Sequence, residues 1–225
     1  NPTGAMIPQE QLRAIAALAV ERDLLVISDE AYESLTYSGH THMSIASLGE
    51  EVKQRTILVN TVSKAYAMTG WRIGYAAGPA DIIKAMSTIQ SQVTSNPTSI
   101  AQKAAVAALL GPQNDLRTMV IEFDRRRRYL LSRLNTIPGI TCTNPEGAFY
   151  LFPNVSSFYG AVANGGPIRN SAEMAAYLLQ TANVVSVPGS EFGSDAHLRL
   201  SYATSMDSIR KGAERIERAL DVLRG

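Results

Sequence analysis

The sequence is poor in cysteine. Cys142 is the single cysteine among 225 residues, so no internal disulfide can form. One thiol fits a reducing compartment such as the cytoplasm. Hydrophobic runs long enough to cross a bilayer are lacking, and no signal peptide opens the chain. We therefore expect a cytoplasmic globular protein that does not associate with a membrane.

Strong charge of one sign and metal-ligand patterns are equally scarce. Lysine and arginine total 21 against 20 acidic residues, a formal net charge of +1, so no nucleic-acid partner is expected. The one basic cluster, Arg125–Arg128, lies in a helix-like stretch and is interpreted as a solvated helix face. The three histidines do not show metal-ligand spacing, so no metal site is predicted.

What is present is an alternation of helix-like and strand-like segments, which predicts an α/β fold. Apolar residues at helical spacing predict helices over 8–22, 79–92, 98–110, 116–134, 171–181 and 206–223. Short, continuous apolar runs predict buried strands at 24–28, 56–60 and 72–78. Further strand-like pieces lie at 140–143, 148–153 and 197–203.

The break "GPQND" at 111–115 indicates a domain boundary. We expect residues 1–112 to form a mostly parallel sheet flanked by helices. Residues 113–225 are expected to form a small α+β domain that includes a long connecting helix.

Polar residues follow two of the apolar runs. Asp29 and Tyr32 come after "LLVIS", and Thr61, Ser63 and Lys64 come after "TILVN". In open α/β sheets, ligands bind outside the carboxyl ends of the strands. Both sets are therefore expected to face one crevice.

Lys64 is the central candidate for chemistry. Apolar surroundings favour the neutral, nucleophilic form of an amine, and such lysines form Schiff bases with aldehydes. Asp29 in the same crevice would keep a ring nitrogen protonated. A lysine with this aspartate partner is the arrangement expected for pyridoxal phosphate.

Other residues would hold the remaining parts of that cofactor. Arg72, eight positions after Lys64, offers paired donors to a phosphate, as do the hydroxyls of Thr61 and Ser63. Tyr32 would donate to the phenolate oxygen of the ring.

Several of these residues could also have ordinary structural roles. An aspartate after a strand often caps a helix, a tyrosine there often packs, and a lone arginine often forms a surface ion pair. From the residues taken one at a time, both interpretations of Asp29, Tyr32 and Arg72 stay open.

Four motifs taken together favour the cofactor-binding interpretation of these residues over the structural one. They are "NPTG" at 1–4, "SDEAY" at 28–32, "SKAYAMTGWRIGY" at 63–75 and "LRLSYA" at 198–203, in this order. Over essentially its whole length the chain resembles the class I/II aminotransferases of pyridoxal-phosphate fold type I, in particular the bacterial aspartate aminotransferase-like branch. The resemblance implies a homodimer with active sites at the subunit interface.

The resemblance also implies roles for the residues around the cofactor ring. Lys64 would be the Schiff-base lysine and would shuttle the proton between the substrate and the cofactor. Asp29 would hold the pyridine nitrogen protonated. Tyr32 and Asn1 would hydrogen-bond the 3-oxygen of the ring.

Further roles concern the phosphate and the substrate. Arg72, helped by Ser63 and Thr61, would bind the phosphate. Arg199 would grip the α-carboxylate of the substrate bidentately, and Asn1 would lie against the same carboxylate.

Members of this family have a substantial segment before "NPTG". That segment carries a glycine-containing phosphate loop, an aromatic residue that stacks on the cofactor and residues that read the substrate side chain. We therefore expect this chain to be a C-terminal portion that exposes a sheet edge and apolar surface.

The implied reaction is reversible transfer of an amino group from an amino acid to a 2-oxo acid through pyridoxamine phosphate. Aspartate with 2-oxoglutarate is the first expectation, and aromatic amino acids, prephenate and alanine stay open. Two other functions also stay open. One is β-elimination at a carbon–sulfur bond on the same fold, and the other is a non-catalytic, aminotransferase-like sensing module of a transcription regulator.

Overall fold

The structure is a computed structural model that describes residues 1–163 and 166–224. It contains two compact units. The unit that contains Lys64 comprises Met6–Val120 and is called the lysine unit. The unit that contains Arg199 comprises Asn1–Ala5 and Ile121–Gly225 and is called the arginine unit. No helix in the described part of the chain is long and apolar enough to cross a membrane.

This division differs from the boundary expected at 112/113. It falls between Val120 and Ile121, inside one continuous helix, because "GPQND" ends one helix without interrupting the next. The first five residues belong to the arginine unit. The Gly4 carbonyl oxygen accepts hydrogen bonds from the N–H groups of Glu146 and Gly147, both at 2.8 Å, and these bonds explain the assignment.

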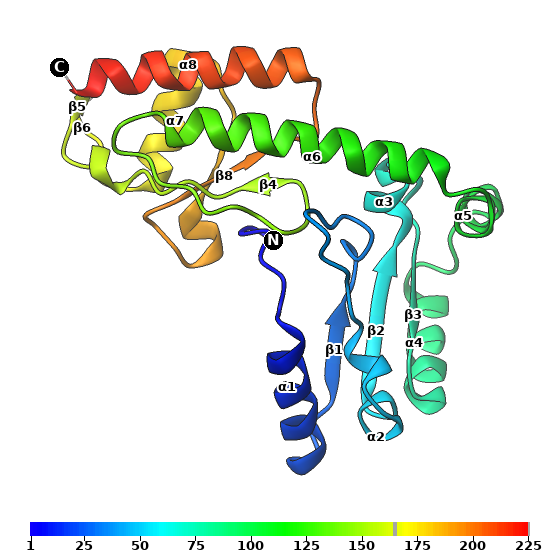
Figure 1. Cartoon of the computed structure of the whole chain (residues 1–225). Coiled ribbons are helices and arrows are strands. Elements are labelled where there is room, and N and C mark those ends of the chain that lie inside the picture. Colours follow the sequence, from blue (N-terminus) through cyan, green and yellow to red (C-terminus); the bar gives the residue numbers. More distant parts are fainter. Residues whose placement is uncertain (164–165, 225) are drawn as a thin grey trace. The chain divides into compact units, whose positions relative to one another are not determined.

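The lysine unit alternates helices with strands along the chain (Figure 1). Its helices are α1 Gln9–Glu21, α2 Glu50–Lys53, α3 Val62–Ala65, α4 Ala80–Val93 and α5 Ser99–Leu110, with 3₁₀ turns η1 Ile45–Ser47 and η2 Thr69–Trp71. Its strands are β1 Val26–Asp29, β2 Thr56–Thr61 and β3 Gly74–Ala77. Helix α6, Asn114–Asn135, begins in this unit and continues into the arginine unit.

The three strands form one sheet in the order β1-β2-β3 (Figure 1). Strands β1 and β2 are parallel, with Asp29 opposite Val59 at the last pair. Strand β3 is antiparallel to β2, with Thr61 opposite Gly74. The α/β class is confirmed. The antiparallel direction of β3 was not anticipated, and it follows from the short connection after β2, which is a reversal and not a crossover.

The arginine unit contains the rest of α6 and two further helices, α7 Ser171–Ala182 and α8 Met206–Arg224. Its strands are β4 Tyr150–Leu151, β5 Val162–Ala163, β6 Gly166–Pro167, β7 Val187–Pro188 and β8 Leu198–Ser201, and its 3₁₀ turns are η3 Ser156–Phe158 and η4 Gly189–Phe192. Strands β4, β8 and β7 form an antiparallel sheet in that order, and β5 pairs with β6.

The core of the arginine unit is closed. Helix α6 buries Phe123, Leu130 and Leu134, and α8 buries a stripe that includes Ile209 and Leu220. Helix α7 begins at Asn170, whose side chain accepts from the Glu173 N–H at 2.8 Å. The unit therefore shows the helix periodicity that the sequence indicated.

Two expectations for this unit were wrong. Residues 140–143 do not form a strand, and only Thr141 makes a bridge, to Asn154. The Asn135 side chain is hydrogen-bonded to both the N–H and the carbonyl of Cys142, which takes the place of ladder bonds there.

Arg125–Arg128 is also not a uniformly solvated face. Arg127 is 2% exposed. It lies four residues after Phe123 and three before Leu130, so helical periodicity places it on the buried stripe. Its guanidinium donates to Asp124, to the Asn144 side chain and to the Pro145 carbonyl.

The lysine unit, by contrast, leaves apolar side chains uncovered. Helix α4 buries no residue, and Ile89 and Val93 on it are 64% and 74% exposed. Ile27 in β1 is 73% exposed. The expected exposure of apolar surface is therefore present in the structure.

Candidate active site

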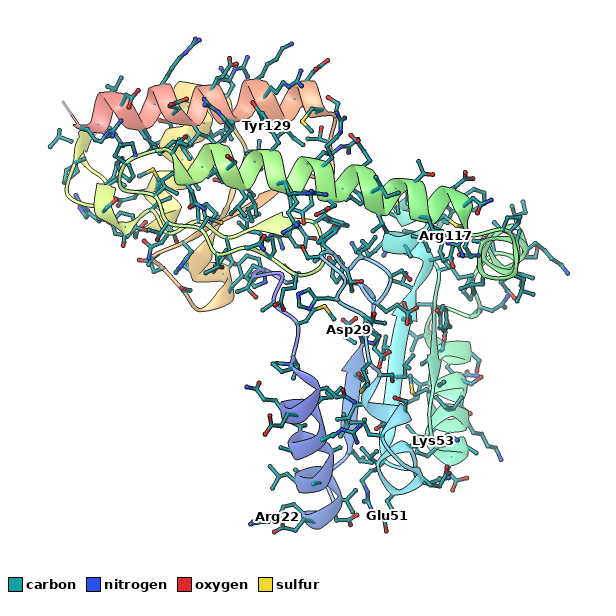
Figure 2. The ribbon with its side chains drawn as sticks, in the orientation of Figure 1. Arg22, Asp29, Glu51, Lys53, Arg117 and Tyr129 are labelled. Atoms are coloured by element: carbon teal, nitrogen blue, oxygen red, sulfur yellow. The ribbon has the colours of Figure 1, made fainter. Side chains whose placement is uncertain are left out.

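The carboxyl ends of β1 and β2 carry the first group of predicted residues. Asp29 is the last residue of β1, and Thr61 is the last residue of β2. Because the two strands are parallel, both ends lie at the same edge of the sheet. Figure 2 labels Asp29 at that end of β1, within the lysine unit. The two strand ends therefore lie together, and the crevice expected beside them stays a prediction.

Lys64 follows β2 directly and lies in the short helix α3. Its neighbours Val62 and Ala65 are buried and anchor the helix, while Lys64 itself is half-buried. The Lys64 Nζ atom lies 5.8 Å from the centroid of the Tyr32 ring. An amine is thus held at the strand end beside a phenol that comes from the segment after β1.

Asp29 does not cap a helix. It is exposed, and its Oδ1 accepts from the Ala31 N–H at 3.1 Å, a local turn that orients the carboxylate. The helix-cap role that the sequence left open is therefore not the one adopted in the structure.

The hydroxyl of Thr61 is used inside its own turn. It donates to the Ile73 carbonyl oxygen at 2.8 Å and accepts from the Ser63 N–H at 3.1 Å, which caps α3. Ser63 is buried. Thr61 thus fastens α3 to the segment that leads into β3.

Arg72 is exposed and adopts a left-handed backbone conformation with φ 53°. One nitrogen of its guanidinium, Nη1, donates to the Thr69 carbonyl at 2.9 Å. This bond ties the guanidinium back to η2 and leaves its other nitrogens for an anion. Arg72 forms no ion pair with any of the described residues. The surface ion pair, which the sequence left open as its ordinary role, is therefore not present there.

The arginine unit brings together the other two predicted residues. Arg199 lies in the middle of β8, and its Nη1 donates to the Asn1 Oδ1 at 3.0 Å. The guanidinium carbon of Arg199 lies 4.6 Å from the centroid of the Tyr150 ring and 4.8 Å from that of Phe192. Sequence reasoning missed both rings.

Sequence reasoning also missed a hydrogen-bonded carboxylate next to Asp29. Glu30 is 3% exposed, and it accepts from Ser28 Oγ at 2.9 Å and from Ser44 Oγ at 2.6 Å. His42 Nε2 lies 2.9 Å from its second oxygen. Twelve residues separate Glu30 from His42, so no local pattern pointed to the pair.

Glu30, Glu33 and His42 also bring their ligand atoms within 4.8 Å of one another, which is a geometry that a metal ion could use. The bonds from Ser28, Ser44 and His42 already occupy the Glu30 oxygens. We interpret this cluster as a structural network that fixes the segment after β1.

Two tyrosines near the sheet have pKa values that are shifted in the same direction. Burial, followed by the charge of Glu33, raises the pKa of Tyr66 and of Tyr75. The Tyr66 hydroxyl donates to the Gln113 side chain at 3.0 Å. Both phenols are therefore neutral donors at neutral pH.

The residues of the lysine unit fit pyridoxal phosphate in their chemistry. A half-buried amine, an exposed carboxylate, a phenol and a guanidinium lie on the segments that follow two parallel strands and one short helix. These are the donor types that the aldehyde, the ring nitrogen, the 3-oxygen and the phosphate each need.

Known proteins match nearly the whole chain. The family model for aminotransferase class I and II matches residues 1–216. The chain is 50% identical over 221 residues to an aspartate aminotransferase of Geobacillus stearothermophilus, covering 98% of this chain and 55% of that protein. It is 46% identical to an aspartate/prephenate aminotransferase of Nitrosomonas europaea, covering 96% and 55%.

Solved structures match as well. The aspartate aminotransferase from Rhizobium meliloti superposes with a TM-score of 0.93 at 44% identity, over 98% of this chain and 56% of that one. An aromatic aminotransferase from Pyrococcus horikoshii superposes with a TM-score of 0.91 at 39% identity, over 100% and 58%. The chain spans about half the length of the curated relatives it matches.

Proposed function

Because this chain belongs to the class I and II aminotransferase family, we propose that it is part of an enzyme that moves an amino group between an amino acid and a 2-oxo acid. The observation that carries the proposal is the position of Lys64. It is a half-buried amine directly after β2, beside Tyr32, at the sheet edge where Asp29 also ends a strand.

Pyridoxal phosphate, when bound, supplies the electron sink that allows the bonds at the substrate α-carbon to break. In the proposal Lys64 Nζ holds the cofactor covalently, and Asp29 keeps the pyridine nitrogen protonated. Tyr32 donates a hydrogen bond to the 3-oxygen. Arg72 and Ser63 hold the phosphate, and Thr61 supports them by fixing the turn before α3.

Two groups of this chain act on the substrate in the proposal. Lys64 Nζ, released once the substrate amine has taken its place on the cofactor, would take the proton from the substrate α-carbon and deliver it to the cofactor carbon. Arg199 binds the α-carboxylate with the planar fork of its guanidinium. Its bond to Asn1 fixes one nitrogen of that fork, so Asn1 lies next to the bound carboxylate.

Aspartate and 2-oxoglutarate are the proposed substrates. The support is that several of the most similar relatives are aspartate aminotransferases, among them those of Geobacillus stearothermophilus and Bacillus subtilis. We also propose a homodimer in the cytoplasm, supported by the family and by the single cysteine.

Covalent labelling tests the position of the cofactor. This chain is incubated with pyridoxal phosphate, reduced with borohydride and mapped by peptide mass spectrometry. We expect one stoichiometric adduct on Lys64 and none on the exposed Lys84 or Lys103, which serve as internal controls. If the full-length protein is labelled equally on all three lysines, the cofactor assignment is wrong.

An activity assay tests the reaction itself. The full-length protein is given aspartate and 2-oxoglutarate, and oxaloacetate and glutamate are measured as products. Equal amounts of both support amino-group transfer. Release of ammonia and pyruvate from cysteine-type donors, without formation of glutamate, would replace the proposal with β-elimination.

A further inference from the structure

The guanidinium of Arg199 lies over two aromatic rings. Its central carbon is 4.6 Å from the Tyr150 ring centroid and 4.8 Å from the Phe192 ring centroid. Both distances fall well inside the range in which a guanidinium and a ring face attract each other. Arg199 is partly buried, so these contacts are less screened by water than surface pairs are.

The strand register explains how the two rings reach the same side chain. Tyr150 on β4 is paired with Ser201, two residues beyond Arg199 on β8, and therefore lies on the same face of the sheet. On the other side of β8, Val187 of β7 is paired with Arg199. Strand β7 leads directly into η4, which ends at Phe192. One ring thus comes from the strand on one side of β8, and the other comes from the 3₁₀ turn that follows the strand on the other side.

Each ring is supported from behind by further aromatic side chains. The Phe192 ring meets Phe152 edge to face at 6.2 Å, and Phe152 stacks on His197 at 4.7 Å and 7°. Ser194 Oγ and His197 Nδ1 are hydrogen-bonded at a distance of 2.8 Å. The Tyr150 ring lies 4.8 Å from Phe149. Both rings that contact Arg199 are therefore themselves in contact with further aromatic side chains.

We propose that Phe192 and Tyr150 are positioning residues that hold the Arg199 guanidinium in one orientation, with its N–H edge available to a carboxylate. The inference rests on the proposed function, in which Arg199 binds the substrate carboxylate. The N–H groups of a guanidinium lie in its plane, so contacts of its central carbon with the two rings leave those N–H groups available for hydrogen bonds. Asn1 Oδ1 accepts a hydrogen bond from one nitrogen of the guanidinium, and a bidentate carboxylate can accept from the remaining N–H groups.

A flexible arginine would have to lose rotamer freedom each time a ligand binds, whereas a clamped arginine has lost that freedom already. The amino acid and the 2-oxo acid both carry the recognised carboxylate. Loss of one ring should therefore weaken both substrates by a similar factor. Because a carboxylate is bound alike before and during reaction, the turnover number should change little.

The test uses Phe192→Leu in the full-length protein. We expect the KM values of both substrates to rise roughly three- to tenfold, with kcat within about twofold, because a single cation–π contact is lost. Phe192→Tyr restores a ring and should restore the KM values. Tyr129→Leu is the matched control, since it removes the ring below Arg210 at 5.9 Å and should leave both KM values unchanged.

A readout independent of turnover separates this inference from the proposed function. Binding of maleate, a dicarboxylate without an amino group, is measured by calorimetry for the parent, Arg199→Ala, Phe192→Leu and Phe192→Tyr. The inference predicts weaker binding in the first two variants and recovery in the third. In parallel, ¹⁵N NMR of arginine side chains should show faster guanidinium rotation of Arg199 in Phe192→Leu.

The outcomes are distinguishable. If Arg199→Ala binds maleate as the parent does, the assigned role of Arg199 fails. If Arg199→Ala weakens binding but Phe192→Leu does not, the positioning role is overturned while the proposed function stands. If Phe192→Leu unfolds, as circular dichroism would show, Phe192→Met decides the question with the same measurements, because its flexible side chain can fill the irregular gap left by the ring.

Discussion

The arginine unit buries most of its large apolar side chains, with exceptions such as Val185 and Val222, whereas the lysine unit exposes many of its own. Leu134, Leu198 and Leu220 in the arginine unit are 0–1% exposed. Ile27, Val93 and Leu110 in the lysine unit are 73–83% exposed. The unit with the more exposed apolar surface carries the amine that is proposed to perform chemistry. The unit with the closed core carries the arginine that is proposed to bind the substrate.

This difference has a physical cause in the two frameworks. The arginine unit packs amphipathic helices against an antiparallel sheet, so each apolar stripe finds a partner within the unit. The lysine unit has a three-stranded sheet, and its helix α4 buries no residue. Local geometry at a strand end can thus be well defined even where the surrounding helices leave apolar side chains exposed.

The largest expected effect is at Lys64. Lys64→Ala in the full-length protein should abolish aspartate–2-oxoglutarate transamination, a fall of several orders of magnitude, because the reacting amine is removed. Arg199→Lys in the other unit should mainly raise KM, since a lysine keeps the charge but loses the planar fork. Steady-state kinetics of both variants provide the check. Wild-type-like turnover of Lys64→Ala would contradict the mechanism.

The next effect compares core packing in the two units. Leu134→Ala removes a side chain that is 0% exposed and should lower the free energy of unfolding by about 2–5 kcal/mol. Ile89→Ala removes one that is 64% exposed and should cost at most about 0.5 kcal/mol. Urea denaturation followed by circular dichroism measures both. Equal losses would show that α4 is buried in solution.

A smaller effect concerns the uncovered apolar surface of the lysine unit. Ile89→Lys with Val93→Lys places charges on one exposed face of α4 and should reduce self-association and the binding of a hydrophobic dye by this chain. Val222→Lys in α8, at a position 75% exposed, is the control and should change little. Light scattering and dye fluorescence report the result. An unchanged dye signal in the double variant would assign the exposed patch elsewhere.

The smallest effect is at Cys142 in the arginine unit. Burial raises the pKa of its thiol to about 11, so at pH 8 only about one molecule in a thousand carries the reactive thiolate. Iodoacetamide should therefore label the native chain slowly and the urea-unfolded chain much faster. Because the folded pKa is raised, this group stabilises the fold below pH 9 and the effect is lost as the pH rises from about 9 to 11.

Labelling of native Cys142 as fast as in urea, measured at pH 8 by mass spectrometry, would contradict a closed arginine unit around this thiol. The Cys142→Ser variant gives the background rate from other nucleophiles.

The strand ends of the lysine unit could be predicted from the sequence, because short continuous apolar runs indicate buried parallel strands and ligands bind beyond the carboxyl ends of such strands. This pattern located both Asp29 and Lys64. The motifs added Asn1 and Arg199, which lie 198 positions apart and are joined in the structure at 3.0 Å.

Other features could not be predicted because they depend on register across strands or on contacts distant in sequence. Tyr150 and Phe192 meet Arg199 only through the pairing of β4, β8 and β7. The burial of Arg127 was open to prediction from helical periodicity, but its partners Asn144 and Pro145 lie in a later loop. The unit boundary inside α6 is not marked in the sequence, because a continuous helix has no break there.

The bond between Asn1 and Arg199 also bears on the order in which the molecule is assembled during synthesis. The first residue of this chain leaves the ribosome long before Arg199 is made. The side-chain amide of Asn1 can form its hydrogen bond to Arg199 only after β8 has been synthesised and paired. Closing so long a loop is slow compared with forming the helices, so we expect Arg199, which is proposed to bind the carboxylate, to acquire its full set of neighbours late in folding. Nascent chains that end before Arg199 would therefore already contain Lys64, but they would lack the arginine that is proposed to bind the substrate carboxylate.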